Sequence, residues 1–382
     1  MRRPVANELS ALIELAGNSV DDLVITPAES LHVAIARRVS AALGPAGRPA
    51  WAIQRSAART VYGGVRHMIR GAAALGAGTA MLVGGEDMEV LSQSRRGRGA
   101  ISALNALAGD VLDERASSLA IRMSVMGAGG AVTCDRDDLR SAFPKAGRRI
   151  AVFLHGLGET PEAWRRKRRS TFGARLHRDF RMTAVYVAYN TGLHINENGA
   201  RLSELLEALV RNWPVRVEQL VLVGHSMGGL VARSACHAGI AGRRSWPART
   251  THLFTLGSPH MGVPLEKAVH AAALALRSVP ESTPLADVID RRSAGIRDLR
   301  KGYAADGDVG CVQTFISASR FSNAVGWLAG DLLVRSESAT GRRSDGSVVV
   351  SSDHVFHLPA LTHFDLLDHP LVYKAMKDII AA

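Results

Sequence analysis

The chain has 382 residues, of which 47% are hydrophobic and 21% charged, a composition that suits a folded protein with a sizeable core and excludes global disorder. The formal net charge of +12 favours contact with anionic surfaces, but no nucleic-acid-binding motif accompanies it, and an arginine-rich solvated surface explains it equally well. The three cysteines are widely spaced and predict neither a disulfide framework nor a zinc site.

Residues 1–145 differ from the rest of the chain. Apolar residues recur at helical spacing in "LHVAIARRVSAAL" and "GAISALNALAGDVLDE", so we expect a helical N-terminal extension. It ends in "SLAIRMSVMGAGGAVTCD", which alternates like a strand and predicts a hairpin that joins the sheet. Glu8 and Glu14 fall where a signal peptide needs an apolar core, and "GAAALGAGTAMLVGG" is too short to span a bilayer. A cytoplasmic protein is expected, with peripheral membrane contact as the alternative.

From residue 146 to 382, buried strands alternate with amphipathic helices. Runs such as 150–154 and 219–223 are apolar and β-branched throughout, as in strands covered on both faces. This alternation predicts an α/β fold with a mostly parallel central sheet flanked by helices. The segment at about 262–305 is helical, apolar and interrupted by prolines, and we interpret it as a cap or lid, with plain packing on the sheet as the alternative.

The most informative stretch is "EQLVLVGHSMGGLVARSA", in which a strand, a sharp turn and a helix follow one another. The turn reads Gly224-His225-Ser226-Met227-Gly228, the pattern G-x-S-x-G. Glycines fit here because a tight strand-to-helix turn has no room for Cβ atoms. Such a turn presents a serine hydroxyl at the carboxyl edge of the sheet, so Ser226 is the candidate nucleophile.

A serine nucleophile needs a base and an acid, which in this arrangement follow it in the order Ser, Asp or Glu, His. Asp331 in "GDLLV" is the candidate acid, and Asp353 is the second choice. His363 is the candidate base, placed in a loop between the strand-like "SVVVSS" and the final helix. His260 precedes the acid, so a pocket-lining role is favoured for it over that of the base.

The loop His155-Gly156-Leu157-Gly158 follows the strand at 150–154. In hydrolases of this pattern, the residue after the nucleophile and a residue of this loop donate N–H groups to the developing oxyanion, here Met227 and Leu157. The alternative is an ordinary Gly-rich loop.

Further side chains are expected to bind the substrate: His155, Gly156, His225 and His260. The histidines near the C-terminus lack the spacing of a metal site, so no metal is expected. The basic run at 165–169 is either the rim of the site facing an anionic surface or the solvated start of a helix.

With these residues placed, the chain resembles the α/β-hydrolase superfamily, and within it lipases and esterases similar to GPI-inositol deacylases. The matching phrases are "FLHGLG", "VLVGHSMGGLVAR", "TLGSPHMGVPLE", "GDLLV" and "LTHFDLLDHP", which lie between about 148 and 382. The resemblance implies that Ser226 is the nucleophile, Asp331 the acid and His363 the base. It departs in one place, since Leu332 stands where a second glycine often follows the acid.

The implied activity is a serine hydrolase that cleaves carboxylic esters, including lipid acyl esters, through an acyl-enzyme and without a cofactor. Two alternatives stay open: acyl transfer to an acceptor other than water, and a non-catalytic module that binds a membrane or a partner. The expected partners are a small-molecule or lipid ester and an anionic membrane surface, with no nucleic acid.

Overall fold

The computed structural model describes residues 95–165, 170–262, 293–303, 307, 309–319, 331 and 334–382. The chain divides into two compact units. One consists of Arg98–Arg115, Ala120–Glu266 and Ser293–Ala382, and every feature below belongs to it. The other consists of Met1–Gly97, Ala116–Leu119 and Lys267–Arg292, nearly all of which lies outside the described residues, as does most of the cap predicted at about 262–305.

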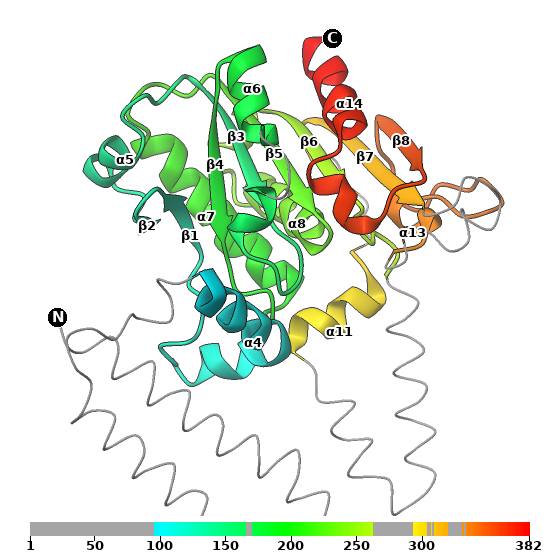
Figure 1. The fold of residues 1–382 in the computed structure, drawn as a ribbon, viewed down its shortest axis with the longest axis horizontal. Helices are drawn as coiled ribbons and strands as arrows, with labels where there is room; N and C mark the ends of the chain where they lie inside the picture. Colours follow the sequence, from blue (N-terminus) through cyan, green and yellow to red (C-terminus); the bar gives the residue numbers. More distant parts are fainter. Residues whose placement is uncertain are drawn as a thin grey trace, which may run out of the picture. The chain divides into compact units, whose positions relative to one another are not determined.

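An eight-stranded sheet forms the centre of the larger unit, in the order β2-β1-β4-β3-β5-β6-β7-β8 (Figure 1). All neighbouring strands from β4 to β8 pair in parallel, whereas the hairpin β1–β2 joins the edge of the sheet antiparallel to β4. The strands are β1 Ser124–Gly127, β2 Gly130–Val132, β3 Arg149–Leu154, β4 Met182–Ala188, β5 Gln219–His225, β6 Thr250–Leu256, β7 Val312–Ser319 and β8 His354–Pro359.

Helices cover both faces of the sheet. They are α4 Arg95–Glu114, α5 Arg136–Ala142, α6 Phe172–Phe180, α7 Ile195–Asn212, α8 Met227–Ala241, α11 Ala294–Lys301, α13 Ser336–Thr340 and α14 Pro370–Ala381, with 3-10 turns η3 Pro161–Arg165, η4 Pro247–Arg249 and η6 His363–Leu367. The predicted fold class, a mostly parallel sheet flanked by helices, is therefore confirmed. The domain boundary at 145/146 stays a prediction.

Alternation along the central strands divides the core into two layers. On β5, Leu220 and Leu222 point to the face that α7 and α8 cover, and Val221 and Val223 point to the face that α6 and α14 cover. The central strands are therefore apolar on both sides, as the unbroken hydrophobic runs predicted.

One expected strand is absent. "SVVVSS" forms a bend held by the N–H groups of Val349 and Val350, which both donate to the carbonyl of Gly341. The strand that pairs with β7 lies a few residues later, at β8. Gly341 has φ +67°, a left-handed turn that directs the chain into this bend.

Candidate functional site

Ser226 lies in the turn between β5 and α8, at the carboxyl edge of the sheet. Its φ is +53°, and such a conformation in a non-glycine residue costs on the order of 1–3 kcal/mol. The turn is held by the Ser226 N–H, which donates to the carbonyl of Leu256 at 2.8 Å. A Cβ at Gly224 or Gly228 would come within 2.5 Å of backbone atoms, so the neighbouring glycines are required by close packing.

Asp331 and His363 form a buried pair. The Nδ1 of His363 lies 2.6 Å from Oδ2 of Asp331, and the side chains are 4% and 1% exposed. The second carboxylate oxygen accepts the N–H of Val334 at 2.8 Å, and the His363 N–H donates to the Asp331 carbonyl at 3.3 Å. With Nδ1–H donated to the carboxylate, Nε2 of a neutral imidazole keeps its lone pair and can accept a proton.

A capping box places His363 at the start of η6. The Thr362 hydroxyl and N–H both donate to Asp365, at 2.6 and 2.8 Å, which fixes the first turn of η6 and with it the direction of the histidine. The sequence "THFD" contains this capping box.

Ser226 and His363 both lie against the end of β6. Leu256 holds the Ser226 N–H, and a Cβ built on the next residue, Gly257, would lie 3.1 Å from Cε1 and Nδ1 of His363. Gly257 has φ +63°, so both its conformation and the lack of space exclude a side chain. The structure therefore brings Ser226, Asp331 and His363, three residues far apart in sequence, to one edge of the sheet.

The loop after β3 touches the nucleophile. A Cβ at Gly156 would lie 3.1 Å from Cβ of Ser226. The N–H of Gly156 donates to Glu159 and that of Gly158 to Thr191, whereas no hydrogen bond to the N–H of Leu157 is found within the described ranges. Met227 begins α8, where first-turn N–H groups have no partner within the helix. These two N–H groups are the ones predicted for the oxyanion.

Glu159 is a residue of the site that sequence reasoning missed. Its Oε2 accepts the N–H of Gly156 at 2.8 Å and faces Nδ1 of His225 at 3.0 Å. Burial raises the pKa of Glu159, but the neighbouring His225 and the Gly156 N–H outweigh it, and the pKa falls to about 2. The sequence signal was an acid three residues after the glycine of the loop.

His155, His225 and His260, three residues predicted to bind substrate, are at most 1% exposed and are bonded within the protein. Nδ1 of His155 lies 3.0 Å from the carbonyl of Gly156, and its ring stacks on Tyr189. His225 and His260 each have protein partners at both ring nitrogens. Gly156 lies against Ser226, and substrate contact by these four residues stays a prediction.

His260 belongs to a network around the buried Arg233 of α8. Arg233 donates to Oε1 of Gln313 and to the carbonyl of Tyr303, both at 2.8 Å, and its Nη1 lies 3.4 Å from Nδ1 of His260. Nε2 of His260 lies 3.2 Å from the Thr255 hydroxyl. Burial, and then the charge of Arg233, hold the pKa of His260 well below its ordinary value, so its imidazole is neutral.

The other candidate acid and the other C-terminal histidines lie elsewhere. Asp353 precedes β8 and accepts the N–H of Gln313 at 2.7 Å, near the start of β7, whereas Ser226 lies at the carboxyl ends of the strands. His357 on β8 faces the hydroxyls of Ser317 and Ser319, and His369 caps α14.

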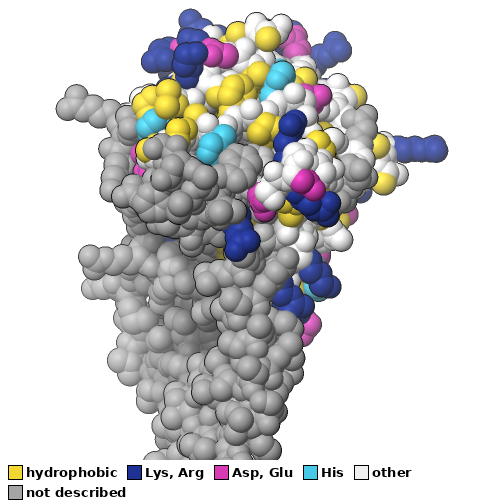
Figure 2. All heavy atoms as spheres, turned by 90° about the vertical axis from the view of Figure 1, so that its right-hand side faces the viewer, with side chains coloured by type: hydrophobic (Ala, Val, Ile, Leu, Met, Phe, Trp, Pro, Cys, Tyr) yellow, Lys and Arg dark blue, Asp and Glu magenta, His cyan; other side chains and the backbone are white. Residues whose placement is uncertain are grey.

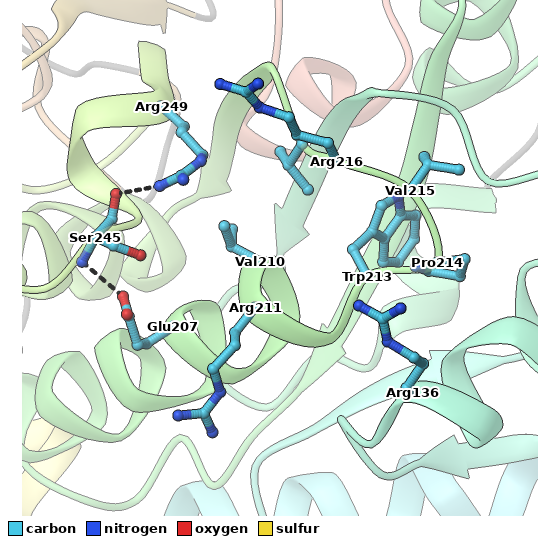
Figure 3. Close-up of a pocket in the computed structure, with 11 residues that line it drawn as sticks. Arg136, Glu207, Val210, Arg211, Trp213, Pro214, Val215, Arg216, Ser245 and Arg249 are labelled. Carbon is cyan, nitrogen blue, oxygen red and sulfur yellow. Dashed lines mark hydrogen bonds between the residues drawn. The ribbon is translucent and has the colours of Figure 1, made fainter.

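A cavity of about 430 Å³ lies at the opposite edge of the sheet from Ser226. It is lined by residues just before β5 and β6, including Arg216 and Arg249, together with Arg136, Arg211, Glu207 and Trp213. Figure 3 shows two hydrogen bonds on its wall, in which Arg249 donates to the Ser245 carbonyl and the Ser245 N–H donates to Glu207. Because the strand ends that carry Ser226 and His363 point away from it, this cavity is separate from the candidate site.

Surface and metal features add little. Within the described part of the chain, no helix is both long and apolar enough to cross a membrane, and no cluster of three or more metal-ligating side chains is present. Of the basic run at 165–169, only Arg165 is described. On the face shown in Figure 2, Lys and Arg side chains are scattered among apolar, acidic and histidine side chains.

Residues 179–319 match the family model described as a PGAP1-like alpha/beta domain. Similar solved structures include a lipase of Bacillus licheniformis, BlEst2 in its mature form, with 16% identity, coverage of 61% of this chain and 91% of that chain, and a TM-score of 0.42. No curated protein matches the chain.

Two further similar structures are a gene product of Listeria innocua and a thioesterase of Streptomyces coelicolor, RedJ. The first has 14% identity, coverage of 60% and 92%, and a TM-score of 0.38. The second has 20% identity, coverage of 62% and 92%, and a TM-score of 0.37.

Proposed function

We propose that this chain, which has the sheet order and helix layers of an α/β-hydrolase fold, is a serine hydrolase that cleaves carboxylic esters through an acyl-enzyme on Ser226. The observation that carries the proposal is the buried His363–Asp331 pair, whose side chains are 2.6 Å apart. The ring of His363 packs against Gly257, and the preceding residue, Leu256, accepts the N–H of Ser226. Metal-free ester cleavage needs this set of groups: a nucleophile, a base that an acid orients, and N–H donors for the oxyanion.

The proposed reaction has two halves. Nε2 of His363 takes the proton of the Ser226 hydroxyl as the oxygen attacks the ester carbonyl, and the N–H groups of Leu157 and Met227 stabilise the oxyanion. His363 then gives the proton to the leaving alcohol, which leaves an acyl group on Ser226. Water, deprotonated by the same histidine, releases the acid and restores the serine. Asp331 keeps Nδ1 protonated and stabilises the imidazolium.

The substrate class is part of the proposal. The proposed substrates are small or lipid acyl esters, and the proposal includes peripheral contact with an anionic membrane, which the net charge of +12 favours, and no nucleic acid. Acyl transfer to another acceptor shares the first half of the reaction. The molecule that attacks the acyl-enzyme, and not the triad, therefore decides between hydrolysis and acyl transfer.

Hydrolysis of p-nitrophenyl esters of graded acyl length tests the proposal. Ser226→Ala is expected to lower kcat by at least about 10³-fold. The matched control is Ser234→Ala, which changes a buried serine of the same helix and is expected to keep the activity. Equal rates for Ser226→Ala and the unmutated protein would refute the proposal, and product formation that requires an added alcohol would replace hydrolysis by acyl transfer.

A further inference from the structure

His225, the residue before the nucleophile, has an acceptor at each ring nitrogen. Nδ1 lies 3.0 Å from Oε2 of Glu159, and Nε2 lies 3.1 Å from the backbone carbonyl oxygen of His363. A neutral imidazole carries one N–H and one lone pair, so it can donate to only one of these oxygens and would set its lone pair against the other. An imidazolium, with two N–H groups, satisfies both.

We propose that His225 is an imidazolium at neutral pH, paired with Glu159, and that this pair positions the catalytic base by holding the backbone of His363 against the elbow. The assignment of the charge stands on geometry alone, whereas the positioning role rests on the proposed function. His225 is a positioning residue, since its own nitrogens face the protein on both sides.

Glu159 extends the connection to the oxyanion loop. The same oxygen that faces His225 also accepts the N–H of Gly156 at 2.8 Å. One carboxylate oxygen therefore joins the loop after β3, through His225, to the loop that carries His363. The ring of His225 also lies 4.6 Å from the ring of His363, centroid to centroid, so a shift of either loop would displace the other.

The surroundings favour the charged pair. The side chains of His225 and Glu159 are 1% and 13% exposed, and such groups are stable as ions only when they are paired and hydrogen-bonded. Burial lowers the pKa of His225, but Glu159 and the His363 carbonyl outweigh it, and the pKa is raised.

Other ionisable groups face the pair from the neighbouring elements. They are His155 at the end of β3, Glu162 of η3 with its partner Arg98 of α4, and Asp331 with His363 on the base side. His155 is buried, and burial lowers its pKa, so it adds no second positive charge to the cluster. The aromatic rings of Trp164 and Phe364, each 6.4 Å from the ring of His225, cover it.

Nitrogen NMR of the full-length protein labelled at histidine tests the charge state directly. The His225 signals, assigned from their loss in His225→Gln, are expected to remain those of an imidazolium as pH rises through neutrality, while exposed histidines lose their protons. In Glu159→Gln, His225 is expected to titrate at least about one pH unit lower. A neutral His225 at pH 7 in the unmutated protein would overturn the proposal, and this readout needs no activity.

The pH profile of kcat tests the positioning role. In Glu159→Gln, kcat is expected to be about 10-fold lower above the lowered pKa of His225 than below it, with KM unchanged. The matched control is Glu207→Gln, at the opposite edge of the sheet. Glu207 also accepts backbone N–H groups, and its substitution is expected to leave the pH profile of kcat unchanged.

The outcomes separate the two proposals. A Glu159→Gln loss that is uniform in pH would assign Glu159 a purely structural role and overturn the positioning role. If Ser226→Ala kept full activity, the proposed function would fail, and the NMR result on His225 would still decide the charge state. Should Glu159→Gln not fold, Glu159→Asp shortens the side chain and weakens its pairing with His225, so a smaller loss of kcat on the same high-pH side is expected.

Discussion

Two buried histidines near Ser226 differ in charge, since His225 is the proposed imidazolium and His260 is neutral. His225 ends β5 and His260 follows β6, and both are completely buried. Oxygen acceptors surround His225, a carboxylate on one nitrogen and a carbonyl on the other. His260 has a guanidinium at one nitrogen and a hydroxyl at the other. Burial is the same in the two places, so the partners and not the burial decide which histidine holds the second proton.

The surroundings of His225 and those of His260 also have different roles in the structure. The His225 side ties loops together at the catalytic edge, while the His260 side fixes α8 to β6 and β7 through Arg233. Stability and reactivity should therefore respond differently to substitutions on the two sides.

The largest effect on stability is expected from Arg233→Met. The substitution keeps much of the apolar stem but leaves Oε1 of Gln313 and the carbonyl of Tyr303 without their donor. Leaving buried acceptors unsatisfied costs about 1–3 kcal/mol each, so we expect a loss of about 3 kcal/mol in the free energy of unfolding, measured in urea. It also removes the positive charge beside His260, so the pKa of His260 should rise.

The control for that substitution is Arg148→Met. Arg148 pairs with Glu218 at 2.5 Å, but its side chain is 66% exposed, and exposed pairs contribute about 0–1 kcal/mol. Similar losses in both variants would contradict the importance assigned to the buried network.

The pH dependence of stability is expected to have opposite signs on the two sides. Glu159 has a lowered pKa, so its contribution is present above 4.5 and is lost as pH falls toward 2, a loss on the order of 3 kcal/mol. His225 has a raised pKa, so its contribution is complete below 6.5 and is lost as pH rises through the higher folded value. The pair therefore stabilises most between about 4.5 and 6.5. Urea unfolding of the unmutated protein and of Glu159→Gln across pH measures this window.

His260 supplies the opposing case. Because its pKa is lowered, only the unfolded chain binds this proton, and stability falls as pH drops below 6.5. His260→Gln is expected to remove that acid-side loss, whereas His225→Gln removes the base-side one. The comparison fails if the two variants change the same limb of the curve.

Much of the fold follows from the sequence because its strands are covered on both faces. Unbroken apolar runs such as that of β5 predicted buried parallel strands, and the glycines around Ser226 predicted the sharp turn. The chain order favoured His363 over His260, and the "GDLLV" segment favoured Asp331 over Asp353. The structure brings Asp331 and His363 together and leaves Asp353 at the other edge. "SVVVSS" misled because its valines have the right composition for a strand, but their N–H groups bond to a turn.

The Glu159–His225 pair could not be predicted in the same way. The two residues are 66 positions apart, and the third partner is a backbone carbonyl, which has no sequence signature. The pattern G-x-S-x-G shows that a residue stands between glycine and serine, but its charge depends on partners that only the assembled loops supply. His225 and His260 therefore looked alike in the sequence, as two histidines near the nucleophile.

The smallest effect is expected from Thr255→Val, which removes the oxygen at Nε2 of His260 while keeping the shape of the side chain. Because Arg233 donates at Nδ1, the proton of the neutral ring is on Nε2, and the substitution leaves that N–H buried without its acceptor. The expected loss is about 1 kcal/mol in the free energy of unfolding. Thr314→Val on the neighbouring strand β7 is the matched control, since its buried hydroxyl has no hydrogen-bond partner among the described residues, and it should lose nothing. If Thr255→Val were as stable as the control, Nε2 of His260 would carry no proton. Arg233 would then not donate to Nδ1, and the explanation given for the neutral His260 would be wrong.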